Sequence, residues 1–222
     1  MPTMSCCHVD GIQDQFNEKA VAKTLKRYRR RGPDRTTQLL IAALRRALDE
    51  RDLRNASLLD VGGGVGAIHH ALLDGRVARA THVDASWAQI GAAKVETAQR
   101  GHGERVEFIA GDFVSVAGQI KPADIVTLDR VICCYDDMPR LVDASAAKAG
   151  RLYGAVYPRA VRWMRIAMAA INVWMKMKRS TFRVFLHPPS AIDERLRAGG
   201  LRRRSVDYAM GWEVAVYERE TG

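Results

Sequence analysis

The chemistry most clearly encoded in this sequence centres on a glycine-rich turn that follows a short apolar run and precedes a helical pattern. Its glycines are Gly62, Gly63, Gly64 and Gly66. Glycine permits backbone conformations that other residues avoid, and it lets a ligand approach the main chain closely. With Ala67, the turn also satisfies the dinucleotide fingerprint G-x-G-x-x-A, so on its own it does not identify the nucleoside ligand.

Three aspartates at the ends of successive predicted strands narrow the choice of ligand. Asp60 directly precedes the glycines, where a dinucleotide has no special need of a carboxylate but a bound cation or ammonium group does. Asp84 closes the second strand, where a carboxylate can accept hydrogen bonds from ribose hydroxyls. Asp112 follows Gly111 at the end of the third strand and can accept from an adenine amino group beside Phe113. Any one of these could be a turn or cap residue, but three together predict a nucleoside site.

The elements that position these residues alternate between strand and helix. Strands are predicted at residues 57–61, 80–83, 105–110, 123–128 and 151–157. Such alternation implies crossover connections and a mostly parallel sheet. Two short strands at 201–207 and 212–217 predict an antiparallel hairpin at the sheet edge. The predicted fold class is therefore α/β, a doubly wound, seven-stranded, mostly parallel sheet with a C-terminal hairpin and N-terminal helices.

Two helical parts flank this core. Residues 1–34 are predicted to be an N-terminal helical segment, with one basic helix over 14–30. Residues 35–222 form the main domain, which begins with a helix to about residue 54 and carries an apolar helical insert at about 159–180. The insert could cap an apolar pocket, lie on a membrane surface or be a core helix.

Composition limits the class of protein. The chain has 222 residues, of which 47% are hydrophobic and 27% charged, which is typical of one globular domain. No run reaches the ~20 apolar residues of a membrane-spanning helix, and residues 1–10 lack a signal-peptide core. The four cysteines form two adjacent pairs rather than a secreted disulfide framework. We therefore predict a cytoplasmic protein with reduced thiols.

The net charge of +10 is concentrated at residues 23–35, 159–183 and 202–204. Such clusters suit an anionic substrate, a nucleic acid or an acidic membrane surface, although each could equally be a solvated face.

Taken together, these residues resemble the class I S-adenosylmethionine-dependent methyltransferases. Residues 60–66 resemble the first motif of the class, Asp84 its ribose-binding acid, and residues 111–113 its adenine-side motif. Residues 123–126 with Asp129 resemble the fourth-strand motif beside the methyl donor. The resemblance covers about residues 35–218 and implies S-adenosylmethionine as cofactor. The binding residues it implies are Asp60, Gly62, Gly63, Gly64, Gly66, Asp84, Ala85, Gly111, Asp112, Phe113, Asp129 and Arg130.

Within the class, the order of parts is most similar to that of small-molecule O-methyltransferases, distantly those of magnesium-protoporphyrin. The shared parts are the N-terminal helical segment, the apolar insert, and a segment like 181–187 before a helix that ends in glycine. Because the N-terminal segment often folds over the active site in this class, the resemblance implies that residues 1–34 act as an active-site lid. The run 129–135 and the four cysteines depart from that pattern and leave the acceptor open.

Methyl transfer from a sulfonium is a direct displacement, so most of the rate can come from alignment in a dry pocket. A general base helps where the nucleophile must lose a proton. The catalytic candidates are Tyr135, Tyr157 and His187, and Arg159 is a candidate anchor for a substrate carboxylate or phosphate. His69 and His70 are interpreted as packing or surface residues, and no metal site is predicted.

The predicted function is methyl transfer to a small, apolar and anionic molecule, with a peripheral membrane contact through residues 159–180 as a further hypothesis. An RNA methyltransferase is suggested by the basic helix, but no RNA-binding module accompanies it, so a nucleic-acid partner is disfavoured. A thiol or metalloid methyltransferase would follow if Cys6, Cys7, Cys133 and Cys134 converged. A non-catalytic nucleotide-binding scaffold and an NAD-linked reductase also remain open, as does the oligomeric state.

Overall fold

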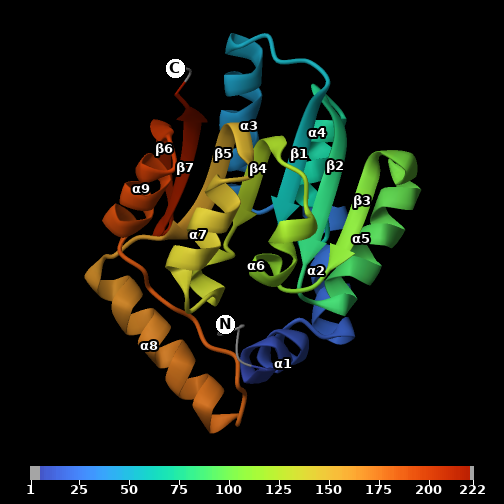
Figure 1. Ribbon diagram of the computed structural model, residues 1–222. Coiled ribbons are helices and arrows are strands. Elements are labelled where there is room, and N and C mark those ends of the chain that lie inside the picture. The colour runs from blue at the N-terminus through green and yellow to red at the C-terminus, as the bar shows by residue number, and fades with distance from the viewer. Residues whose placement is uncertain (1–5, 221–222) are drawn as a thin grey trace.

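A seven-stranded sheet forms the centre of the protein, in a computed structural model that describes residues 6–220. The strands lie in the order β3-β2-β1-β4-β5-β7-β6 (Figure 1). Those from β1 to β5 pair in parallel, and β7 pairs antiparallel with both β5 and β6. The strands are β1 (Ala56–Val61), β2 (Val77–Asp84), β3 (Val106–Ala110), β4 (Ala123–Asp129), β5 (Ala149–Pro158), β6 (Leu201–Ala209) and β7 (Trp212–Arg219). The predicted fold class and hairpin are confirmed.

Helices cover both faces of the sheet and enclose two apolar cores. One face carries α3 (Arg35–Glu50), α4 (Ala67–Leu73) and α5 (Trp87–Gln99), whose core includes Leu40, Leu44 and Leu58. The other face carries α6 (Phe113–Val116), α7 (Met138–Ala146) and α9 (Pro189–Ala198). Figure 1 shows α7 in front of the sheet and α3 behind it. Short 3₁₀ turns lie at Gly103–Arg105, Ala117–Gln119 and Ile132–Cys134.

Three further helices lie at one end of this sandwich. They are α1 (Cys6–Gln15), α2 (Glu18–Arg31) and α8 (Arg162–Met177). In Figure 1, α1 and the chain that follows α8 lie side by side below the sheet, beyond the carboxyl ends of the parallel strands. Phe16 and Phe182 meet edge to face there, with ring centroids 5.9 Å apart. Within residues 6–220, each helix is too short or too polar to cross a lipid bilayer.

The helix predicted over residues 14–30 is in fact part of two helices, and Asn17 separates them. The Asn17 side chain accepts a hydrogen bond from Ala20 N at 3.1 Å and donates one to Asp14 O at 2.7 Å. Asparagine is a favoured N-cap because its side chain satisfies an otherwise unpaired amide of the first turn. The break that was predicted near Gly32 is confirmed, since that residue has φ 73° and ends α2.

Other element boundaries differ from prediction for local reasons. Helix α3 ends at Glu50 rather than near residue 54, because Asp52 and Asn55 take left-handed φ values of 45° and 55°. Strand β2 begins at Val77, earlier than predicted, because this residue pairs with Ala56 of β1 and is buried. Helix α8 lies where the insert helix was predicted.

Close packing between α3 and β5 generates a stability prediction. A Cβ added to Gly154 on β5 would lie 2.8 Å from Leu40 Cδ1 and 3.4 Å from Leu44 Cδ1. We expect Gly154→Val to lower the free energy of unfolding by about 1–3 kcal/mol, the usual cost of overpacking a core. Denaturant unfolding measures the change. Gly118→Val, with nothing within 4 Å of the added Cβ, is the matched control. Equal stability of the two variants would contradict the packing described.

Candidate active site

A cavity of about 480 Å³ opens at the carboxyl ends of β1, β2 and β4. Its floor is the glycine turn that joins β1 to α4, and its walls come from the residues that follow β2, β3 and β4. Its cover comes from Ile12 of α1, the neighbouring Phe16, and two residues after α8, Phe182 and Val184. Parallel α/β sheets bind ligands at this end, so the strand-end residues predicted to form the site are brought together here.

The glycine turn takes a conformation that requires glycine. Gly62, Gly64 and Gly66 have φ values of 62°, 58° and 90°, in the left-handed region. At Gly63 a larger residue is excluded by steric contact, because an added Cβ would lie 2.5 Å from His82 Nδ1 and 2.8 Å from Asp60 Oδ2. A hydrogen bond from Gly62 N to Val83 O at 2.7 Å holds the turn against β2. Of the turn residues 62–66, only Val65 brings a side chain to the cavity lining.

Asp84 lies at the centre of the cavity wall. Its carboxylate accepts hydrogen bonds from Gly64 N at 3.0 Å and Ser86 N at 2.8 Å. Burial raises the pKa of Asp84 to about 6, and the two amide hydrogen bonds partly oppose this rise. Ala85 also lines the cavity, and its carbonyl oxygen accepts a hydrogen bond from Gln13 of α1 at 2.6 Å. Asp84 thus links the turn, the end of β2 and the cavity.

The predicted adenine-side residues also line the cavity. Gly111 donates its N–H to Asp84 O at 2.9 Å and has φ 147°. Asp112 caps α6, accepting hydrogen bonds from Ser115 N at 3.2 Å and Ser115 Oγ at 2.7 Å. Phe113 is buried between the cavity and the core. Asp112 therefore has the structural cap role that the sequence left open, and it also lines the cavity.

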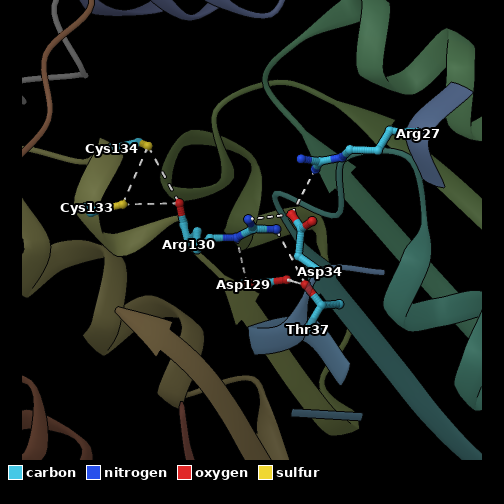
Figure 2. Close-up of polar contacts among 7 residues, drawn as sticks. All are labelled: Arg27, Asp34, Thr37, Asp129, Arg130, Cys133 and Cys134. Atoms are coloured by element: carbon cyan, nitrogen blue, oxygen red, sulfur yellow. Dashed lines mark hydrogen bonds and ion pairs between the residues drawn. The ribbon is translucent and has the colours of Figure 1, made fainter. Parts of the chain in front are cut away.

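An ion-pair network joins the end of β4 to the N-terminal helices (Figure 2). Arg130 donates to Asp129 Oδ1 at 3.1 Å and to Asp34 Oδ2 at 3.0 Å. Asp34 also accepts from Arg27 Nη2 at 2.8 Å, and Thr37 Oγ1 donates to Asp129 Oδ2 at 2.5 Å. All five residues line the cavity. Burial raises the pKa of Asp129, and the nearby guanidinium of Arg130 opposes this rise.

Sequence reasoning missed Asp34 and Thr37 as residues of this wall. The signal present was Asp34 after Pro33 at a helix start, which indicates a cap rather than a site. The distance along the chain, 96 positions from Asp34 to Arg130, conceals the contact.

Asp60 lies below the turn, fully buried. Thr127 Oγ1 donates to Asp60 Oδ1 at 2.8 Å, and His69 Nδ1 lies 3.4 Å from Asp60 Oδ2. Burial raises the pKa of Asp60, an effect opposed by His82 and Thr127. His69 and His70 are buried, as expected for packing residues. The gathering of His69 with His82 around Asp60 was not anticipated, because it depends on the pairing of Asp60 with His82 across β1 and β2.

The three catalytic candidates fall in different places. Tyr135 lines the cavity, and burial followed by the nearby Asp112 raises its pKa. His187 is outside the cavity lining and contacts the backbone oxygen of Tyr135 through Nε2 at 2.8 Å. His187 is therefore placed to position Tyr135.

The prediction for Tyr157 is corrected. Tyr157 is fully buried in the core, where its hydroxyl donates to Glu213 at 3.0 Å and lies 3.1 Å from that of Tyr217. It shares one face of β5 with Tyr153, four residues earlier, and both pack in the core against α7 and α9. Arg159 likewise lies outside the cavity lining, with its guanidinium 4.5 Å from the ring centroid of Tyr208.

Cys133 and Cys134 both line the cavity. Their sulfur atoms lie 3.8 Å apart, so no disulfide joins them to each other. The hydrogen bond with Cys134, together with burial, raises the pKa of the Cys133 thiol, which keeps it protonated at neutral pH. The side chains of Cys6 and Cys7 fall outside what the structure describes, so the predicted convergence of the four thiols stays a hypothesis.

The cavity fits an adenosyl ligand by three observations. The glycine turn offers bare backbone, Asp84 offers a buried acceptor, and Phe113 offers an apolar ring beside Asp112. Above the cavity, α1 packs closely against the segment that follows α8, because Gly11 has no side chain. A Cβ added to Gly11 would lie 2.5 Å from Phe182 N.

Solved structures of methyltransferases share the fold that forms this cavity. The magnesium protoporphyrin IX methyltransferase from Synechocystis PCC 6803, with bound S-adenosylhomocysteine, matches with a TM-score of 0.70 and 16% identity, covering 94% of this chain and 98% of that chain. An O-methyltransferase family 2 protein from Planctomyces limnophilus matches with a TM-score of 0.59 and 20% identity, covering 86% and 63%. The fold is that of the class I S-adenosylmethionine-dependent methyltransferases.

A family model described as an O-methyltransferase domain matches residues 7–144. This match spans more than half of the chain, which therefore belongs to the O-methyltransferase domain family and is an S-adenosylmethionine-dependent enzyme. No curated protein matches the sequence.

The raised pKa of Asp84 predicts how donor binding depends on pH. We expect the affinity for S-adenosylhomocysteine to fall as the pH is lowered through about 6, because protonation removes the charged acceptor for ribose hydroxyls. Asp84→Asn should bind more weakly by about 1–3 kcal/mol, without this pH dependence. Calorimetric titration between pH 5 and 8 measures both. Asp207→Asn, on β6, is the control; a wild-type affinity that does not change with pH would contradict the role of Asp84.

Proposed function

We propose that the protein transfers the methyl group of S-adenosylmethionine to an oxygen atom of a small, largely apolar molecule that carries an acidic group. The observation that carries this proposal is the composition of the cavity. The lining contains the glycine turn and Asp84 together with the apolar side chains of Ile12, Leu141, Phe182, Val184 and Trp212. Arg27 and Arg130 also line this cavity, but Asp34 and Asp129 pair with them, so they offer little free positive charge to an acceptor.

The strand-end residues would hold the donor. Asp84 is placed to accept from the ribose hydroxyls, the residue pair Asp112 and Phe113 to contact the adenine, and the amides of the turn to face the amino-acid part. The donor supplies an electrophilic methyl group on a sulfonium. Residues 129–135 then form the wall nearest the acceptor, where they would align its oxygen and exclude water.

The titratable groups of the cavity indicate what kind of oxygen reacts. Among the described residues that line it, none is a histidine or lysine, and the pKa values of Tyr135 and Cys133 are raised. The aspartates of the lining each accept a hydrogen bond from the chain itself. A carboxylic acid or acidic phenol ionises at neutral pH without help, so it would need only orientation. An acidic acceptor is therefore favoured over an alcohol.

Radiolabelled S-adenosylmethionine tests the proposal. We expect methyl transfer to members of a panel of aromatic carboxylic acids and acidic phenols, with release of S-adenosylhomocysteine. Gly64→Val should abolish transfer, because valine is strained at φ 58° and would project from the turn. Gly118→Val should retain it. Binding of the donor without transfer to any acceptor would contradict the proposal and favour a non-catalytic scaffold.

A second candidate acceptor is a thiol or a trivalent metalloid, because Cys133 and Cys134 line the cavity with sulfurs 3.8 Å apart. Adjacent thiols bind soft centres. The same assay with arsenite and small thiols separates this candidate. In a Cys133→Ser, Cys134→Ser double variant, this transfer should be lost while donor affinity stays intact. That result would establish a thiol or metalloid acceptor in place of an oxygen acceptor.

An RNA substrate has less support. Within the basic helix α2, Arg29 pairs with Glu96 at 2.7 Å and Arg27 pairs with Asp34 at 2.8 Å. These arginines are held by carboxylates of the chain itself, which leaves less positive charge for phosphates.

We also propose that α8 rests on an anionic membrane surface. Its outer side exposes Ile166, Val173 and Met177 at 72%, 60% and 77%. Its inner side buries Met164, Met168 and Met175 against the chain. Residues 159–183 contain several arginines and lysines and no aspartate or glutamate. An apolar face with basic flanks is suited to the interface of acidic lipids.

Vesicle co-sedimentation tests the membrane contact. We expect the protein to sediment with phosphatidylglycerol vesicles, to do so less at high salt, and to stay in solution with neutral phosphatidylcholine vesicles. Ile166→Asp with Val173→Asp should abolish sedimentation. Val95→Asp on α5, where the valine is 52% exposed, is the control. Equal sedimentation of both variants would contradict a role for α8.

A further inference from the structure

A cluster of four histidines lies beneath the glycine turn and takes no part in the proposed transfer. It contains His69 and His70 of α4, His82 of β2, and His102 before the first 3₁₀ turn. The four side chains are buried. His70 and His102 form one pair, with their Nδ1 atoms 3.1 Å apart, and His102 Nε2 lies 3.1 Å from Asp74. The other two histidines face Asp60.

From the second group we infer that Asp60, His69 and His82 bind a divalent transition-metal ion, with zinc as the reference ion, directly beneath the glycine turn. The three contribute Asp60 Oδ2, His69 Nδ1 and one ring nitrogen of His82, and the candidate ligand atoms lie within 4.8 Å of one another. Two histidines and one carboxylate, with a fourth position for water or another ligand, are a common zinc-binding set.

The interatomic distances agree with such a site. His69 Nδ1 lies 3.4 Å from Asp60 Oδ2 and 3.2 Å from His82 Nδ1. Zinc bonds of about 2.0–2.1 Å in a tetrahedron place neighbouring ligand atoms roughly 3.3 Å apart. Two of the three separations therefore match the spacing that a metal ion requires, and the third lies within 4.8 Å.

An unpartnered polar atom points to the same place. Asp60 is 1% exposed, and among the described residues Oδ2 has no hydrogen-bond partner, whereas Oδ1 accepts from Thr127. A buried carboxylate oxygen without a partner is costly, and a cation at this oxygen would remove that cost.

The surroundings support the ligands. Thr127 orients the Asp60 carboxylate, and Thr97 Oγ1 lies 3.5 Å from His69 Nε2, on the ring side opposite Asp60. Contacts of this kind fix the orientation of metal-binding side chains. The ion would join β1, β2 and α4 behind Gly63, whose added Cβ would lie 2.5 Å from His82 Nδ1. Its effect would be to make the turn rigid.

Cobalt substitution in the untagged protein tests the inference. After treatment with chelator and removal of the chelator, one equivalent of Co²⁺ should produce the strong visible bands of tetrahedral coordination. The thiolate-to-cobalt charge-transfer band should be absent, which excludes the cysteine pairs. Zinc should displace the cobalt and raise the thermal midpoint. X-ray absorption of the zinc form should show nitrogen and oxygen neighbours only.

His82→Gln and His69→Gln should each weaken metal binding by at least tenfold, as expected for loss of one ligand. His70→Gln is the matched control, because it removes a buried histidine of the same cluster that is not among the three ligands. If the ligand variants fail to fold, the spectrum and X-ray absorption of the wild type still decide. A thiolate band, sulfur neighbours, the absence of stoichiometric binding, or equal binding by His82→Gln and the wild type would overturn the inference.

Discussion

The conformation of the chain between β1 and α4 is the constraint on which the site depends. The turn must pass within contact distance of Asp60 and His82 on one side, and must present bare backbone to the cavity on the other. Three left-handed glycines and one sterically confined glycine meet both conditions. The hydrogen bond from Gly64 N to Asp84 then fixes the turn against the next strand. A side chain on either face would close the cavity or displace the buried groups.

The second determinant is the connection between the N-terminal helices and the end of β4. Arg130 contacts Asp129 and Asp34 at once, and Arg27 shares the same carboxylate (Figure 2). Because part of this network is buried, its charges interact more strongly than they would at the surface. Helix α2 is therefore attached to the cavity wall at the end of β4, and α1 is attached separately through the hydrogen bond from Gln13 to Ala85 O. This arrangement is consistent with the hypothesis that residues 1–34 form a lid.

The sequence predicts much of this architecture because local patterns determine it. The strand-helix alternation specifies the sheet, and Asp60, Asp84 and Asp112 reach one edge because parallel strands end together. Contacts between distant residues were not predictable in the same way. The partnership of Asp34 with Arg130, the histidines around Asp60, and the burial of Tyr157 depend on which strands pair and which faces pack. Periodicity alone does not contain that information.

Hydrogen–deuterium exchange with and without S-adenosylhomocysteine tests the central claim most directly, because it reports where the ligand lies. The account predicts slower exchange at residues 62–66, 84–86 and 111–113 and in α1, with little change in β6 and β7. Protection confined to other segments, or no protection at saturating ligand, would contradict the assignment of this cavity as the donor site.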